Sequence, residues 1–162
     1  MRGRELREEK AMKEMTLKAV IESIPRITDF VDGELEALDC PMKEQMQIDV
    51  AIDEVFCNIA SYAYPSGTGE AQVRFEFDPA DRTVTLTFTD QGVPFNPLEK
   101  EDPDVTLSAE KRAIGGLGIF LVKKTMDGVE YVRRDGKNIL TLRKKIWRPA
   151  RKETGAEHVL YR

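Results

Sequence analysis

The sequence has few of the residues that build common catalytic triads, disulfide frameworks and metal centres. Its single histidine, His158, lies near the C-terminus of the 162-residue chain. This position excludes a histidine-based triad in the body of the domain. The two cysteines, Cys40 and Cys57, form neither a disulfide framework nor a metal-binding pattern.

Long apolar runs and an excess of positive charge are also absent. No apolar run approaches the roughly 18–20 residues of a membrane span, and the charged start MRGRELREEKAMKEM lacks the apolar core of a signal peptide. We therefore expect a cytoplasmic protein with no membrane partner. The formal net charge is −4, which argues against nucleic acid as the main partner, because nucleic-acid-binding domains are usually basic.

What is present is a succession of helical and strand patterns that is typical of an α+β domain. The order of elements predicts a two-layer α/β sandwich with a mixed, mostly antiparallel sheet, built by residues 14–146 between a charged segment (1–13) and a tail (147–162). The predicted elements are a strand over 15–21, a helix from Pro25, a helix from Pro41 to about Tyr64, strands over 71–77 and 83–89, a long loop over 90–114, a helix from about Gly116 to Met126, and a hairpin from Gly128. In the strand over 15–21, Leu17, Ala19 and Ile21 are predicted to share one side.

Three glycines precede an apolar, helix-patterned run in AIGGLGIFLVKKTMDG, residues 113–128. Glycine weakens a helix interior by about 1 kcal/mol relative to alanine, so this position needs an explanation. Glycines at a helix start let a phosphate approach the free N–H groups of the first turn; the alternative is tight helix packing or a hinge. The P-loop pattern is absent and the dinucleotide fingerprint has another spacing. Both explanations stay open for Gly115, Gly116 and Gly118.

A second candidate lies in the longer helix, in DEVFCNIASYAY, residues 53–64. Glu54 and Asn58 are four residues apart, so they share one face of the helix. An asparagine oxygen can bind Mg²⁺ and a glutamate can act as a base. The alternative is a solvated polar stripe.

A third candidate is DQGVPFNP, residues 90–97, directly after a predicted strand. The carboxylate of Asp90 could accept a hydrogen bond from an exocyclic amine such as that of adenine. Gly92 would let the backbone lie close to a ring. The alternative is an ordinary Asp-x-Gly turn at the end of a strand.

The order and spacing of these three patterns resemble the N, G1 and G2 boxes of the GHKL (Bergerat-fold) ATPases. Within that superfamily, AIDEVFCNIASYAY, TDQGVPFNP and GGLGIFLVKKTMDGVEY are similar to the RsbW-like anti-sigma factor serine-protein kinases. The resemblance covers roughly residues 14–146. It implies the histidine-kinase-like ATPase fold, with ATP and Mg²⁺ as cofactors.

The resemblance also implies roles for individual residues. Asn58 would help hold Mg²⁺, Glu54 would be the general base, Asp90 would bind the adenine amine and Gly92 would allow close packing at the base. The segment that would wrap the phosphates consists of Gly115, Gly116, Leu117 and Gly118. Lys111 and Arg112 are candidates for contacts to the γ-phosphate, with solvated lid charges as the alternative. Tyr62 stands where this branch often has a histidine.

By this resemblance the protein is a serine/threonine-protein kinase and anti-sigma factor of a partner-switching system. Its substrate would be a STAS-domain anti-anti-sigma protein, with a sigma factor as competing partner, and it would form a homodimer. The alternative is a nucleotide-dependent binding switch without kinase activity. A sensor histidine kinase domain is disfavoured, because we expect no phosphoacceptor histidine helix before the domain and the lid is short.

Overall fold

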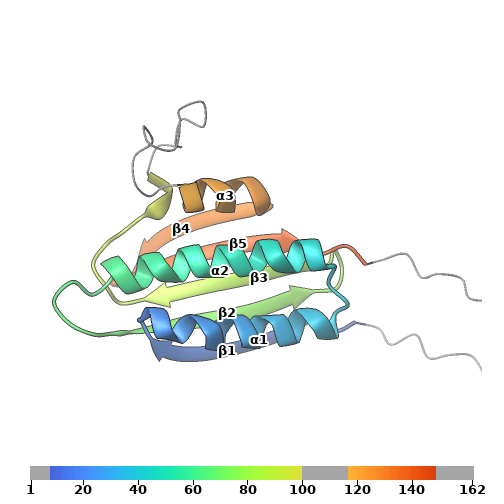
Figure 1. The fold of residues 1–162 in the computed structure, drawn as a ribbon, viewed down its shortest axis with the longest axis horizontal. Helices are drawn as coiled ribbons and strands as arrows, with labels where there is room; N and C mark the ends of the chain where they lie inside the picture. The colour runs from blue at the N-terminus through green and yellow to red at the C-terminus, as the bar shows by residue number, and fades with distance from the viewer. Residues whose placement is uncertain (1–7, 100–116, 149–162) are drawn as a thin grey trace, which may run out of the picture.

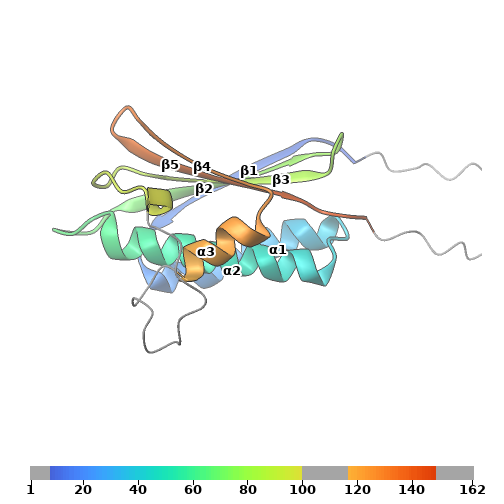
Figure 2. The same cartoon turned by 90° about the horizontal axis from the view of Figure 1, so that it is seen from above.

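A five-stranded antiparallel sheet carries helices on one of its faces (Figures 1 and 2). The computed structural model describes residues 8–99 and 117–148. The strand order is β1-β2-β3-β5-β4. The elements in chain order are β1 (Ala11–Lys18), η1 (Ile21–Ser23), α1 (Ile24–Ala37), α2 (Met42–Tyr62), β2 (Glu70–Asp78), β3 (Thr83–Asp90), η2 (Pro97–Glu99), α3 (Leu117–Thr125), β4 (Gly128–Arg134) and β5 (Lys137–Lys145).

The sheet has one buried face and one open face, as the alternating sequence of its strands requires. On β2 and β3, every second residue points toward the helices and is buried. These inward residues include Val73, Phe75, Phe77, Val84, Leu86 and Phe88, each at most 2% exposed. The outward positions of the same strands are polar or charged, so the opposite face lies open to solvent.

The turn between β4 and β5 follows directly from its sequence. Asp135 and Gly136 both have positive φ, of 52° and 74°, and they connect the paired residues Arg134 and Lys137. Two central residues with positive φ make a type I′ turn, for which Asp-Gly is a preferred pair. The turn fixes the register of β4 against β5, which places Arg133 opposite Asn138. On its other side β5 pairs with β3, and there Asn138 lies opposite Asp90.

Each helix buries one stripe against the sheet. In α1 the buried positions recur every three or four residues, at Ile24, Ile27, Val31 and Leu35, and Pro25 lies in the first turn, where proline is tolerated. The helix α2 packs between α1 and α3. No helix in the described ranges is both long and apolar enough to cross a bilayer.

The predicted α+β fold is confirmed, and every strand pairing among the described residues is antiparallel. The first strand is displaced from its prediction: it begins at Ala11 rather than residue 15 and ends at Lys18 rather than 21. Ile21 lies in η1 and is 57% exposed, so it does not continue the buried side of Leu17 and Ala19. The reason is the partner strand, because β2 begins at Glu70 opposite Lys18. Beyond that pair the Ala19 N–H still bonds to the Gly69 carbonyl at 2.8 Å, and the chain then turns into η1.

Candidate functional site

The helix α2, which packs against α3, carries Glu54 and Asn58 one turn apart. The first turn of α3 lies directly against Glu54: a β-carbon built on Gly118 would come within 1.9 Å of Glu54 Cδ and Oε2. Any residue other than glycine at this position would push the carboxylate aside. Since Glu54 is a flexible side chain, such a substitution would displace its carboxylate and leave the fold intact.

A small cavity lies between α2 and the sheet. Three polar side chains reach it, Asn58 from α2, Asp90 from β3 and Asn138 from β5. Its volume is about 30 Å³, room for roughly two water molecules, so a purine base would have to widen it. The rest of the lining is mainly apolar and consists of Val55, Ile59, Ala63, Phe88, Phe95, Pro97, Tyr131 and Leu140. Apolar walls with a few convergent polar groups are typical of small-molecule sites.

Asn138 and Asp90 form the buried polar end of this cavity, and each is only 5% exposed. The Asn138 Nδ2 atom donates to Asp90 Oδ1 at 2.9 Å and to the Val93 carbonyl at 2.8 Å. Asn138 Oδ1 accepts from the Tyr131 hydroxyl at 2.5 Å and from the Phe95 N–H at 3.3 Å. One amide thus ties β3, β4 and the segment after β3 to β5.

The turn after β3 is also fixed by the end of α2. The Gly92 N–H donates to Asp90 Oδ1 at 2.9 Å, as in an Asp-x-Gly turn. A β-carbon on Gly92 would lie 2.3 Å from the Ala63 carbonyl oxygen, which itself accepts from the Val93 N–H at 2.8 Å. The missing side chain of Gly92 therefore faces the end of α2. Arg133 adds a bond from β4 to the Gly92 carbonyl at 2.8 Å.

Tyr62, at the end of α2, contacts the cavity wall. Its ring lies 5.0 Å from that of Phe95, centroid to centroid, at an interplanar angle of 30°. Phe95 lines the cavity, so Tyr62 supports the wall from outside. The position that often holds a histidine in the resembling branch here carries an aromatic contact.

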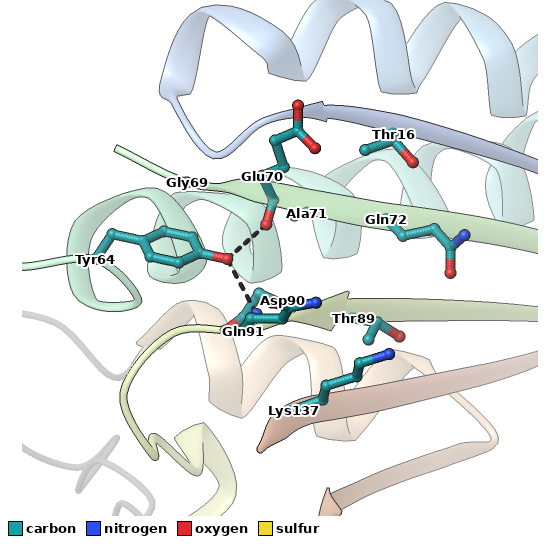
Figure 3. A pocket seen from close by; sticks show the side chains of 10 residues that line it. All are labelled: Thr16, Tyr64, Gly69, Glu70, Ala71, Gln72, Thr89, Asp90, Gln91 and Lys137. Carbon is teal, nitrogen blue, oxygen red and sulfur yellow. Dashed lines mark hydrogen bonds between the residues drawn. The ribbon is translucent and has the colours of Figure 1, made fainter. Parts of the chain in front are cut away.

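The open face of the sheet has a separate polar groove of about 450 Å³, shown in Figure 3. The Tyr64 hydroxyl donates to the Glu70 carbonyl at 2.6 Å and accepts from the Gln91 N–H at 3.0 Å. Outward side chains of the strands form the floor: Thr16, Gln72, Thr89 and Lys137. The groove lies across the sheet from the helices, and Asp90 borders both hollows.

Thiol chemistry at this site is disfavoured by the environment of Cys57, the neighbour of Asn58. Burial raises the pKa of the Cys57 thiol, and the nearby carboxylates of Asp53 and Glu54 raise it further. The thiol therefore stays protonated and is a poor nucleophile. Within residues 8–99 and 117–148 there is no group of three or more His, Cys, Asp and Glu side chains that could hold a metal. A metal beside Asn58 would need ligand atoms from a bound molecule.

The structure brings together several of the predicted site residues. Asn58 and Asp90 line one cavity, and Glu54 lies one turn from Asn58 against Gly118. Leu117, the first residue of α3, is 42% exposed. The remaining predicted residues, Lys111, Arg112, Gly115 and Gly116, lie outside the described residues.

Asn138 was not among the site residues predicted from the sequence. A signal was present, because Asn138, Leu140 and Leu142 alternate on the inward side of β5. A polar residue at an inward position of a strand needs hydrogen-bond partners inside the protein. Its partners come from distant parts of the chain, so only the sheet register reveals them.

Comparison with known families agrees with this geometry. A family model described as the histidine kinase-like ATPase domain matches residues 17–144. The chain belongs to this family. The matched range runs from β1 to β5, so the histidine kinase-like ATPase domain includes every residue of the cavity. Membership implies the use of ATP.

Two similar proteins carry kinase names. The serine/threonine-protein kinase BtrW of Bordetella bronchiseptica is 32% identical over 95 residues, which cover 59% of this chain and 66% of the relative. The serine-protein kinase RsbW of Bacillus thuringiensis is 26% identical over 131 residues, which cover 78% of this chain and 81% of the relative.

A solved structure shows the same fold. It is the crystal structure of the RsbU and RsbW domains of Rv1364c from Mycobacterium tuberculosis, with a TM-score of 0.62 and 17% sequence identity. The match covers 87% of this chain and 34% of that chain. This chain thus corresponds to about a third of the larger protein and to about two thirds of the Bordetella relative.

Proposed function

We propose that this protein is a cytoplasmic serine/threonine-protein kinase that transfers the γ-phosphate of ATP to a STAS-domain anti-anti-sigma protein and acts as an anti-sigma factor. The observation that carries the proposal is the placement of Asp90 and Asn58 at one cavity, with Glu54 one helical turn beyond Asn58. Along the site, Asp90 would bind the adenine ring, Asn58 would bind the metal, and Glu54 would accept the proton.

Each residue has a chemical part in this proposal. Asp90 accepts a hydrogen bond from the adenine amine at the buried end. Asn58 offers an oxygen to Mg²⁺, which is commonly held by few protein ligands together with phosphate oxygens. When bound, the metal neutralises charge on the phosphates. Lys111 and Arg112 would add positive charge there, and the segment of Gly115, Gly116, Leu117 and Gly118 would offer backbone N–H groups to the phosphates.

Phosphoryl transfer needs no covalent enzyme intermediate, but it does need a group that orients the attacking hydroxyl and accepts its proton. Glu54 takes the proton of the acceptor serine or threonine hydroxyl as its oxygen forms a bond to the γ-phosphorus. The bond between that phosphorus and the bridging oxygen breaks, and ADP leaves. The role of Gly118 is to let α3 begin close to the Glu54 carboxylate, which limits the positions that the carboxylate can adopt.

The test is transfer of labelled γ-phosphate to a STAS-domain anti-anti-sigma protein of the same organism, with Mg²⁺ or with a chelator. We expect labelling of the STAS protein only with Mg²⁺. Asn58→Ala, which removes a metal ligand and favours the helix, should weaken Mg²⁺-dependent ATP binding. Equal MgATP affinity of mutant and wild type in calorimetry would contradict the role of Asn58.

A second function, a nucleotide-dependent binding switch without transfer, is favoured by one observation. Tyr62, at a position where the resembling kinases often have histidine, packs against Phe95 in a structural contact. If the protein binds ATP and the STAS protein but transfers no label, this second function replaces the first.

We also propose that the protein forms a homodimer. Analytical sedimentation at micromolar concentration would test this, and a monomer mass would contradict it.

A further inference from the structure

We propose that Asn138 is a positioning residue that orients the Asp90 carboxylate toward the adenine ring of the bound nucleotide. This inference rests on the proposed role of Asp90 in binding adenine. It names a residue that sequence patterns did not single out, and it explains why a polar side chain occupies an inward position of β5.

The hydrogen bonds to the Asp90 side chain are asymmetric. Within the described residues, both end on Oδ1: the Gly92 N–H at 2.9 Å and Asn138 Nδ2 at 2.9 Å. A carboxylate oxygen with two donors already in place has little capacity for a third. The Oδ2 atom is therefore the one presented to a ligand amine, and Asn138 sets which oxygen that is.

The orientation of the Asn138 amide is itself determined by its partners. Both groups near Nδ2, the Asp90 carboxylate and the Val93 carbonyl, are acceptors. Both groups near Oδ1, the Phe95 N–H and the Tyr131 hydroxyl, can donate. A flipped amide would set its oxygen against two acceptors, so one orientation is strongly favoured.

The network also couples the carboxylate to the cavity wall. Val93 and Phe95 are held by the same amide that holds Asp90, and Phe95 lines the cavity. The wall and the carboxylate therefore keep a constant relative position. Widening the cavity for a base must occur elsewhere in the wall or must break one of these bonds.

The decisive variant is Asn138→Asp, which keeps the shape and replaces the donor with a second carboxylate beside Asp90. Two adjacent carboxylates cannot both ionise easily and share a proton at lower pH. At pH 8 we expect ATP affinity to fall by about 10-fold to 100-fold. Toward pH 5.5 the shared proton restores a bond to Asp90 Oδ1, and affinity relative to wild type at the same pH should largely return.

Other charged and titratable groups around Asp90 are the same in mutant and wild type. Among the described residues they are Tyr64 after α2, Glu70 on β2, Tyr131 and Arg133 on β4, and Lys137 on β5. The matched control is Asn96→Asp, which adds the same charge in the neighbouring segment. It keeps the acceptor oxygen for the Leu98 N–H, 2.9 Å away. We expect this control to follow wild type at every pH.

Two further measurements separate positioning from a general structural role. Inorganic tripolyphosphate has no base, so its binding should be the same in Asn138→Asp and wild type. The preference for ATP over GTP should fall in the variant at pH 8. A pH-independent loss that extends equally to tripolyphosphate would overturn the proposal.

If thermal unfolding shows that Asn138→Asp does not fold at pH 8, the ATP affinity of Tyr131→Phe tests the proposal instead. It removes only the hydroxyl that donates to Asn138 and should weaken ATP by about threefold; unchanged affinity would overturn the proposal. A wild type that binds no nucleotide would overturn the proposed function as well. Weakening by Asp90→Asn but not by Asn138→Asp would overturn only the role of Asn138.

Discussion

The two ends of the candidate site are held in different ways. At the base end, Asp90 and Asn138 are buried and every hydrogen bond of the Asn138 amide is made within the protein. At the phosphate end, Glu54 and Asn58 are partly exposed on α2. Within the described ranges, no hydrogen bond or ion pair is found for the Glu54 carboxylate, and its close neighbour is Gly118.

The difference indicates how each end would bind a ligand. A satisfied buried network fixes its geometry before a ligand arrives and is costly to disturb. Partly exposed side chains on a rigid helix keep their rotamer freedom until a ligand supplies partners. We expect the base end to determine which nucleotide binds, and the phosphate end to determine whether a phosphate is transferred.

The largest expected effect is at the phosphate end. Glu54→Gln should keep ATP affinity and partner binding and lower the rate of phosphotransfer about 10²–10⁴-fold, the usual contribution of a general base. The size and helix propensity of the side chain are preserved. Single-turnover transfer and calorimetry on the same samples would check this. A near-wild-type rate would show that Glu54 is only a polar helix residue.

The next effect should appear at the base end. Asp90→Asn removes the negative charge and keeps only one acceptor oxygen. The new amide NH₂ group can then face the adenine amine, which is also a donor. An unpaired buried polar group costs roughly 1–3 kcal/mol, so ATP should bind about 10-fold to 100-fold more weakly. Preference over GTP should shrink, because guanine lacks that amine. Competition binding of both nucleotides measures this, and an unchanged preference would count against the assignment.

Gly118→Ala should have a smaller effect, confined to the phosphate end. The added methyl group would displace the Glu54 carboxylate, so we expect a loss of transfer rate of about tenfold with little change in ATP affinity. The control is Gly33→Ala in α1, where a β-carbon meets nothing within 4 Å. The control should gain stability of roughly 0.5–1 kcal/mol from helix propensity and keep full activity. Equal transfer rates in both variants would refute the role of the Gly118 contact.

The smallest effect on nucleotide binding and transfer is expected outside both ends, from two carboxyl groups between α1 and α2 that act on stability instead. Burial, a hydrogen bond with Asp32 and the charge of Asp32 raise the pKa of Asp49 from 3.8 to about 7. Asp32 Oδ1 and Asp49 Oδ1 are both buried and have no hydrogen-bond partner among the described residues. Burial of this kind disfavours the charged form of a carboxyl group.

Because the folded state favours protonated Asp49, the associated stability is fully present below pH 3.8 and is lost as pH rises through about 7. Asp49→Asn should remove this slope and raise Tm at pH 8 more than at pH 5. Asp53→Asn, at an exposed position one turn along α2, should leave the slope unchanged. Thermal unfolding between pH 4 and 9 checks both variants, and a slope that survives in Asp49→Asn would contradict the raised pKa of Asp49.

The elements with a strong local period could be predicted from sequence. The helix from Pro41, the strands with alternating phenylalanines and the Asp-Gly turn are set by residues close in the chain, and they appear as expected. The family was also accessible, because Glu54, Asn58, Asp90 and Gly118 occur in an informative order.

What sequence could not supply depends on pairing between distant segments. The ends of β1 are set by β2, about 60 residues away. The role of Asn138 follows from its register with Asp90. The two explanations for Gly118 could be separated only by seeing Glu54 beside it, and the contact of Gly92 with Ala63 joins a helix end to a strand end.

The length of α2 has a further consequence. A single helix carries Glu54, Asn58 and, at its end, the Ala63 carbonyl that holds Gly92 and Val93. At about 1.5 Å per residue, the spacing along the axis is roughly 6 Å between the first two and 7.5 Å from Asn58 to Ala63. One residue inserted between Asn58 and Ala63 would rotate Glu54 by about 100° relative to the base end. Evolution can therefore exchange side chains along this segment far more readily than it can change the number of residues.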